Sequence, residues 1–291
     1  FIGILALVFT MSFTVNAQTA ITQANIQSAV DLWVSNEATS ESTYGHISDW
    51  DVSNVTSMSS LFQNKGSFND DISNWDVSNV TNMYGVFFGA SIFNQNLSDW
   101  DVSNVTNMDR MFYNSDFNNN GQALTWDVSG VGDMQYMFSF SDFNQDISSW
   151  NVSNGPNMQG MFNTCSPFNQ DISGWDVSSV SNMSVMFKNT SSFNQDISDW
   201  DVSSVTNMTN MFLGASALSE DNQCAIHSSF SSNENWPYDW SDNCIPIIEG
   251  CMDETAFNYA SEANTDDGSC VAVIEGCMDE TAFNYASEAN T

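Results

Sequence analysis

The sequence predicts an α/β repeat solenoid in which seven strand-turn-helix units stack between an N-terminal and a C-terminal cap. The first observation is a regular series of tryptophans, 24 to 26 residues apart: Trp50, Trp75, Trp100, Trp126, Trp150, Trp175 and Trp200. The second is that Asp-Val-Ser follows each of them, except that Asn151 replaces the aspartate in the fifth copy. One such unit cannot bury its own apolar side chains, whereas stacked units can, so the repeats define one continuous core.

Two apolar spacings follow each other inside a unit. In the sixth copy, Trp175 and Val177 are two residues apart, which predicts one face of a short strand. The next apolar residues have helical spacing and predict a short helix: Val180, Met183, Met186 and Phe187. A Thr or Ser before the Asn-Met pair can cap this helix. The Trp, Met and Phe columns are therefore expected in the core.

A representative stretch of the repeat is FNQDISDWDVSSVTNMTNMF, residues 193–212. It resembles the repeat of the BspA-like leucine-rich-repeat surface proteins of bacteria, and the resemblance extends over about residues 44–216. This resemblance implies a leucine-rich-repeat-like stack in an exported or cell-surface protein, of a kind often described as adhesin-like. The fifth copy departs from the pattern because Gly155-Pro156 replaces Val-Thr. Proline cannot donate a backbone hydrogen bond, so we expect a local irregularity there and no continuous groove across it.

The first 45 residues predict a leader and a cap. Residues 1–17 read as a secretory signal peptide that is incomplete at its N-terminus, with cleavage expected after Ala17. Residues 18–45 form the N-terminal helical cap, and 46–216 the seven copies. Within 20–36 the apolar residues have helical spacing: Ile21, Ile26, Ala29, Val30, Trp33 and Val34. A secreted or cell-surface location follows from the leader.

The other end contains most of the cysteines. Residues 217–246 are expected to cap the last copy, and a disulfide between Cys224 and Cys244 would stabilise that cap by roughly 3 kcal/mol. Residues 247–291 hold two copies of IEGCMDETAFNYASEANT, the second of them truncated. We expect Cys251 to pair with Cys270 inside the first of these modules. The modules resemble short G-C-x-D and D-D-G-S-C modules found near the C-termini of exported bacterial proteins.

Two cysteines are left over by this pairing. Cys277 lies in the truncated copy, where the partner corresponding to Cys270 is missing. Cys165 stands where other copies have Ala or Thr, which favours a buried structural thiol.

Calcium is the one ligand ion that the motifs suggest, and no other cofactor is expected. Four residues beside Gly268 supply side-chain oxygens within a short loop: Asp253, Asn264, Asp266 and Asp267. The spacing is not that of the EF-hand. The alternative is a turn rich in Asp and Asn that a disulfide holds, without a metal.

Charge and histidine content limit the function classes. Three basic residues face 36 acidic ones, which gives a net charge of -33 and argues against nucleic-acid partners. His46 and His227 lie near opposite ends of the predicted stack, too far apart to share a nucleophile, so we expect no catalytic residues and no enzyme activity. No apolar stretch of the mature chain is long enough to span a membrane.

The strongest candidate for a binding site is a row of aspartates between the Trp and the Val of each strand: Asp51, Asp76, Asp101, Asp127, Asp176 and Asp201. These side chains should point away from the core. Neighbours about 5 Å apart would repel by about 0.8 kcal/mol in water, which a stack can tolerate without bound cations. We favour a solvated structural row, with a dedicated ion or ligand row as the alternative. Six recurring asparagines predict a second ladder, in which each bonds to the next copy: Asn69, Asn94, Asn118, Asn144, Asn169 and Asn194.

These features predict a non-enzymatic, monomeric binding protein that presents an acidic face to an extracellular protein or glycan. A polysaccharide-acting hydrolase or lyase is one alternative, and a structural spacer for another domain is the other. Differences between copies concentrate at positions such as Tyr84-Gly85, Asp109-Arg110 and Gln135-Tyr136, in the predicted helix. An enzyme should instead show a single non-repeated cluster of polar residues, so this pattern favours binding or structure.

Overall fold

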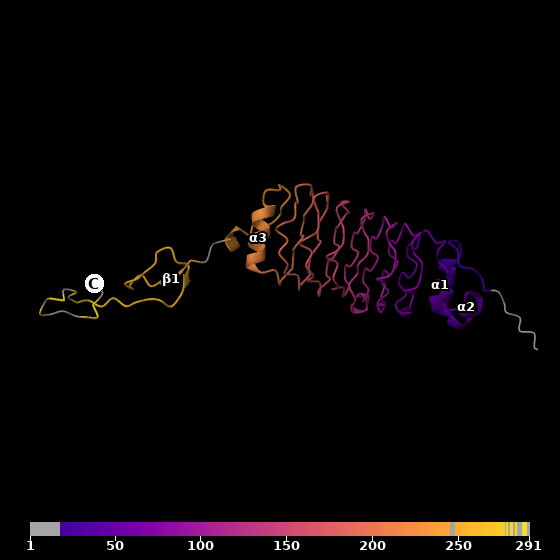
Figure 1. The fold of residues 1–291 in the computed structure, drawn as a ribbon, viewed down its shortest axis with the longest axis horizontal. Coiled ribbons are helices and arrows are strands. Elements are labelled where there is room, and N and C mark those ends of the chain that lie inside the picture. Colours follow the sequence, from indigo (N-terminus) through magenta and orange to yellow (C-terminus); the bar gives the residue numbers. More distant parts are fainter. Residues whose placement is uncertain are drawn as a thin grey trace, which may run out of the picture. The chain divides into compact units, whose positions relative to one another are not determined.

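The structure is a computed structural model that describes residues 18–244 and 248–276, together with 278, 280–281, 283 and 287–289. The expected signal peptide and Cys277 lie outside the described residues. The chain divides into two compact units, Phe1–Asp239 and Trp240–Thr291. In the first unit, seven copies stack between a pair of helices at one end and a single helix at the other (Figure 1).

The elements are few and short. The three α-helices are α1 (Ile26–Ser35), α2 (Glu37–Tyr44) and α3 (Glu220–Phe230). The 3-10 turns are η1 (Ile47–Asp49), η2 (Asn119–Gly121) and η3 (Ser241–Cys244), and the strands are β1 (Glu249–Gly250) and β2 (Thr265–Asp266).

Helix α1 covers the first copy through its apolar face. Ile26, Ala29, Val30 and Trp33 are buried, as their helical spacing predicts. A second helix follows at once, because Asn36 ends α1 and its side chain accepts a hydrogen bond from the Thr39 N–H to begin α2. The N-terminal cap thus contains two helices, where the spacing predicted one.

The core consists of aromatic columns that run along the stack. The Trp rings of copies 4 to 7 lie parallel at 6.3 to 6.4 Å, and two Phe columns stack beside them at 5.3 to 6.4 Å. From Trp75 onward, each Trp of the column also donates its indole N–H to a carbonyl of the preceding copy, as Trp175 does to Ile147 at 3.1 Å, while Trp50 donates to Gly45 of the cap. The indole nitrogen, the only polar atom of each Trp side chain, is therefore hydrogen-bonded within the apolar core.

Backbone hydrogen bonds join the copies through what we call the pairing segments: 58–64, 83–89, 108–114, 134–140, 158–164, 183–189 and 208–214. In the first copy the amides of Met58, Ser60, Phe62 and Asn64 donate to carbonyls of the second copy, at 2.7 to 3.0 Å. The amides between them bond within their own copy, as Leu61 does to Met58. Isolated parallel bridges, such as Asn82 with Asn107, lie at the start of these segments.

The strand and the helix expected in each copy are absent as regular elements from the described residues. The pairing segment holds the residues of the predicted helix, but its third and seventh residues have positive φ in every copy, for example Ser60 (59°) and Asn64 (57°). A left-handed residue interrupts an α-helix, and alternate amides are committed to the next copy. The Trp-x-Val stretch buries both side chains, but the described residues form no strand pairing there.

The asparagine ladder is confirmed. The side-chain oxygen of Asn144 accepts the backbone N–H of Asn169 at 2.9 Å, and the same bond recurs from Asn69 through Asn194. The ladder is half-buried or exposed at the edge of the stack rather than buried within it.

The predicted irregularity in the fifth copy is also confirmed. In copies 2, 3, 4 and 7 a backbone amide donates to the copy before it, as Thr81 does to Thr56, but Pro156 has no N–H. Asn157 donates to Gly132 in its place, and no parallel bridge joins Asn157 to Asn182 although both are described. The series of parallel backbone bridges is therefore interrupted between the fifth and sixth copies, whereas the asparagine ladder continues.

The C-terminal end of the stack is covered in part by α3, which buries Ile226 and Phe230. The side-chain amide of Asn233 donates to the Val202 and Val205 carbonyls of copy 7, at 2.7 and 2.9 Å. The second unit has its own parallel pair, β1 with β2, and a disulfide between Cys251 and Cys270. Cys224 and Cys244 are each disulfide-bonded as well.

Candidate functional site

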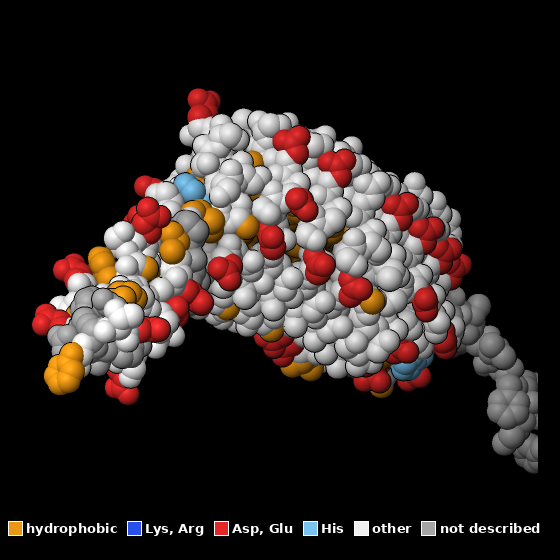
Figure 2. Space-filling view, turned by 60° about the vertical axis from the view of Figure 1, so that its left-hand side comes forward, with side chains coloured by type: hydrophobic (Ala, Val, Ile, Leu, Met, Phe, Trp, Pro, Cys, Tyr) orange, Lys and Arg blue, Asp and Glu red, His pale blue; other side chains and the backbone are white. Residues whose placement is uncertain are grey.

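The acidic row is exposed in all six positions, and each carboxylate closes a local turn. The Asp76 Oδ1 accepts the backbone N–H of Ser78 at 3.1 Å and its hydroxyl at 2.6 Å. Asn151, which replaces the aspartate in the fifth copy, makes the same two bonds to Ser153. Figure 2 shows acidic side chains distributed over one face of the molecule, with polar surface around them. The Asp-Val-Ser motif thus has a structural explanation that requires no ligand.

Electrostatics in the row agree with this explanation. The hydrogen bonds from Ser78 lower the pKa of Asp76, while the Asp51 carboxylate raises it by a smaller amount. The same balance holds for Asp176, whose pKa is lowered by Ser178 and raised slightly by Asp201. Repulsion along the row is therefore outweighed locally, and a dedicated ion or ligand row stays a prediction.

Side chains that differ between copies gather at the outward positions of the pairing segments of copies 2 to 5, which we call the variable edge. Phe88 stacks on Tyr113 at 4.8 Å, and Tyr113 meets Phe140 at 5.4 Å, so three successive copies form one aromatic ridge. Phe140 is 46% exposed. Phe88 and Tyr113 are half-buried. A row of partly exposed aromatic side chains is uncommon on a surface and is typical of binding sites.

A polar cluster accompanies this ridge. The Arg110 guanidinium contacts the Asp109 Oδ2 at 2.6 Å and lies over the Tyr136 ring, 5.1 Å from its centre. The Tyr136 hydroxyl accepts a hydrogen bond from the Gln159 side chain at 2.7 Å. A Cβ on Gly160 would approach the Tyr136 ring to 2.3 Å, so the glycine leaves room for this ring. The cluster joins copies 3, 4 and 5 and has no counterpart elsewhere in the described stack.

Asp109 is the unusual member of the cluster. It is only 7% exposed, and its Oδ1 is buried without a hydrogen-bond partner. Burial raises the pKa of Asp109 to about 6; Arg110 opposes this shift and Asp133 adds to it. The sequence pattern located these residues as variable positions, but it gave no sign that one carboxylate is buried, because burial depends on the neighbouring copies.

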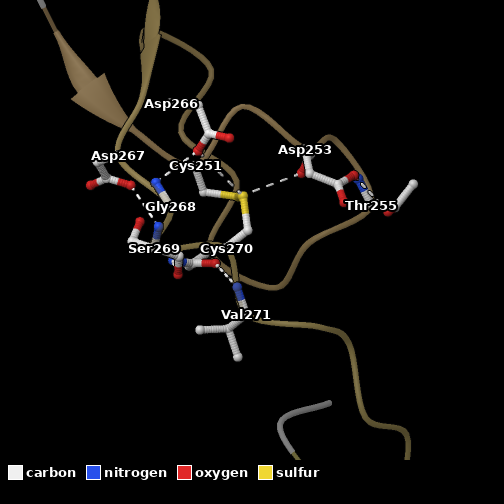
Figure 3. Close-up of a disulfide and its surroundings, with 10 residues drawn as sticks. Cys251, Asp253, Thr255, Asp266, Asp267, Gly268, Ser269, Cys270 and Val271 are labelled. Atoms are coloured by element: carbon white, nitrogen blue, oxygen red, sulfur yellow. Dashed lines mark hydrogen bonds between the residues drawn. A yellow bond between two sulfur atoms is a disulfide. The ribbon is translucent and has the colours of Figure 1, made fainter.

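The calcium candidates belong to the second unit and are exposed around the disulfide (Figure 3). Asp253 accepts the N–H and hydroxyl of Thr255, while Asp266 and Asp267 accept the N–H groups of Gly268 and Ser269. Figure 3 places Asp253 and Asp267 on opposite sides of the disulfide.

The fourth candidate, Asn264, accepts the Ile248 N–H. Within the described part of the chain, no three His, Cys, Asp or Glu side chains are placed to hold a metal ion. Calcium binding by this loop stays a prediction.

The histidines and the free thiol have structural contacts. The Nδ1 of His46 lies 2.8 Å from the Ser48 hydroxyl, and the Nδ1 of His227 accepts the Trp236 indole N–H at 3.1 Å. Cys165 is a free cysteine and fully buried, as expected, and desolvation raises the pKa of its thiol to about 12. A thiol of that kind is not a nucleophile.

Comparison with known proteins gives a family without an activity. Residues 31–139 and 117–224 each match the family model described as "Mycoplasma protein of unknown function, DUF285". The chain belongs to the DUF285 family. The two matches overlap and together extend from α1 into α3, so DUF285 describes the stack of copies and its first cap. No curated protein and no solved structure matches the chain.

The DUF285 stack and the unit that follows it contain four disulfide-bonded cysteines. Disulfides persist in oxidising environments, which fits an extracellular or surface location. None of the helices in the described ranges combines the length and the apolar character needed to cross a membrane.

Proposed function

We propose that the chain is a non-enzymatic, secreted or cell-surface binding protein of the adhesin-like, BspA-like kind. Its stack would be a leucine-rich-repeat-like solenoid that holds the variable edge rigid in front of an extracellular protein or glycan. The observation that carries the proposal is the partly exposed aromatic ridge of Phe88, Tyr113 and Phe140 on this edge.

The repeated residues support this proposal because they already have structural tasks. The Trp and Phe columns fill the core, the asparagines join successive copies, and the aspartates close turns. The side chains left to contact a partner are those that differ between copies. Tyr, Phe and Arg, which gather on the variable edge, are the residue types enriched in protein interfaces.

Charge determines which partners the surface tolerates. A net charge of -33 repels nucleic acids and anionic lipids at long range, while it attracts basic partners. Within this acidic surface the variable edge is nearly neutral, because Arg110 is paired with Asp109. A neutral glycan or a protein surface of mixed character can therefore approach it without strong repulsion.

A glycan and matrix-protein array tests the proposal with the purified chain, with and without calcium. The test variants are Tyr113→Ala and Phe140→Ala, which remove exposed ridge contacts. The matched control is Asp101→Asn, which keeps a side-chain oxygen for the turn to Ser103 while it changes the charge of the acidic row.

We expect a ligand that binds the wild type and the control but loses at least tenfold in affinity with the ridge variants. Binding that survives both ridge variants and fails with Asp101→Asn would move the site to the acidic row. A chain that is folded but binds nothing on the array would instead favour the spacer role.

One observation favours a polysaccharide-acting hydrolase or lyase as the second candidate. Asp109 is buried, has a pKa of about 6, and lies where Asp133 influences its titration. A carboxylic acid of raised pKa near a second carboxylate is the arrangement that glycoside hydrolysis uses. Release of reducing sugar from surface polysaccharides, abolished in Asp109→Asn, would support this candidate over binding.

A further inference from the structure

The last copy of the stack has backbone donors without acceptors. In each of the six contacts between successive copies, the first, third, fifth and seventh amides of a pairing segment donate to carbonyls of the next copy, at 2.7 to 3.1 Å. Copy 7 has the same segment, 208–214, but no eighth copy follows it. In the described part of the chain, the amides of Met208, Asn210 and Gly214 have no acceptor. The fourth, Phe212, donates to the Tyr238 hydroxyl at 2.8 Å.

The opposite end of the stack is capped by side-chain hydrogen bonds. There the carbonyls of the first copy would be open, but α1 and the turn before it supply side-chain amides. Gln23 donates to the Ser57 carbonyl at 3.0 Å and accepts the Thr56 and Ser57 amides, and Gln27 donates to the Leu61 carbonyl at 3.3 Å. At the C-terminal end, the Asn233 side-chain amide donates to carbonyls of copy 7 but accepts none of the described pairing-segment amides. Among the described residues, Tyr238 is the acceptor found for the donors of copy 7.

The same end also has one exposed apolar side chain and two that are slightly less buried than their counterparts in interior copies. Leu213 is 49% exposed, and Phe212 and Ala215 are 5% and 8% exposed. Their counterparts in the interior copies, such as Phe87 and Ala90, are fully buried at 0%. The cap therefore leaves a strip at which amide donors lie beside apolar surface, which is the arrangement of an unprotected edge strand.

We propose that this strip, formed by the Met208, Asn210 and Gly214 amides and the Leu213 side chain, binds an extended segment of a partner protein, which would displace the Tyr238 hydroxyl from the Phe212 amide. The segment would continue the stack by supplying its backbone carbonyls, as in other cases of binding by added strands. A second copy of this chain cannot pair through the same strip, because both surfaces would present donors. A copy in head-to-tail contact meets the N-terminal cap, where Gln23 and Gln27 already bond two of the four carbonyls that the first copy would offer.

The chemistry of this partner segment follows from the strip. It needs carbonyls at every second residue and an apolar side chain to cover Leu213. It also needs little negative charge, because the chain carries -33. The site lies at the end of the stack and depends on backbone atoms, so it stands apart from the variable edge proposed above.

The test uses the chain's own pairing sequence as the probe. A synthetic peptide of residues 206–214, TNMTNMFLG, acetylated and amidated, is uncharged and contains the four carbonyls that copy 7 offers to copy 6. Amide hydrogen exchange of the full chain is followed with and without this peptide. A scrambled peptide of the same composition is the matched control.

We expect exchange at Met208, Asn210 and Gly214 to be fast in the free chain and to slow at least tenfold with the peptide at millimolar concentration. Amides of copy 4 and the scrambled-peptide sample should not change. Leu213→Asp should weaken the effect at least tenfold, whereas Ile92→Asp, at an equally exposed apolar position elsewhere, should leave it intact.

Two results would overturn the proposal. Slow exchange of the three amides in the free chain would show that the chain itself covers the strip, and exchange unchanged by the peptide would show that the strip does not accept a segment. Because the readout is exchange at copy 7, it is independent of the array that tests the variable edge.

Discussion

Replacement of Asn144 by alanine is the most direct test of how the copies are held together. The Asn144 Oδ1 accepts two hydrogen bonds from the next copy, from the Asn169 N–H and from the Gln170 side chain, both at 2.9 Å. Each bond contributes about 0.5–1.5 kcal/mol net, so Asn144→Ala should lower the free energy of unfolding by about 1–3 kcal/mol.

Two further variants separate the hydrogen bonds from side-chain size. Asn144→Asp keeps an acceptor at Oδ1, and the Asn144 Nδ2 donates to nothing among the described residues, so this change should cost less than the alanine. Asn54→Ala is the matched control. In copies 2 and 3, the equivalent Asn79 and Asn104 side chains donate to the preceding copy, but Asn54 has no copy before it.

The assay is urea unfolding at pH 7 together with hydrogen exchange at Asn169, which reports the local contact even if the stack does not unfold in two states. We expect faster exchange of the Asn169 amide in Asn144→Ala and wild-type exchange in Asn54→Ala. Equal stability of Asn144→Ala and Asn54→Ala, with slow exchange at Asn169 in both, would refute the ladder as a source of stability.

Four other predictions concern backbone strain, the free thiol, pH and salt. Val185→Gly should raise the free energy of unfolding by about 1 kcal/mol in urea titrations, because a β-branched residue at φ 52° is strained where copies 2 and 5 have Gly85 and Gly160; a loss of stability would contradict this. Cys165 should react with thiol reagents only as fast as the chain unfolds, since it is buried with a pKa of about 12; prompt labelling of the native chain would show that it is accessible. Because Asp109 has a pKa of about 6 when folded and 3.8 as its ordinary value, the folded state binds the extra proton, and its contribution to stability should increase as pH falls from 7 to 4; Asp109→Asn should remove this contribution from the pH profile of urea midpoints. With a net charge of -33, the melting temperature should rise with salt or millimolar calcium, and a flat profile from low salt to physiological salt plus calcium would contradict this.

The sequence determined the period of the stack, its aromatic core and its asparagine ladder. These follow from local spacing: residues that recur at the same place in every copy must lie in columns, and a column of Trp or Phe is stable only inside. The irregularity at Pro156 could also be predicted from the sequence, because the missing backbone N–H is a property of proline itself.

The tertiary structure decided how each copy is bonded. The predicted helix and the observed pairing segment have the same apolar spacing, so the side-chain pattern of Met183, Met186 and Phe187 could not distinguish them. The two structures differ in the sign of φ at positions such as Val185. A positive φ is favourable there only when the next copy, about 25 residues away, offers carbonyls to the backbone amides. The burial of Asp109 and the open donors of copy 7 also depend on neighbouring copies. Asp109 is buried because other copies pack against it, and the donors of copy 7 are open because no further copy follows.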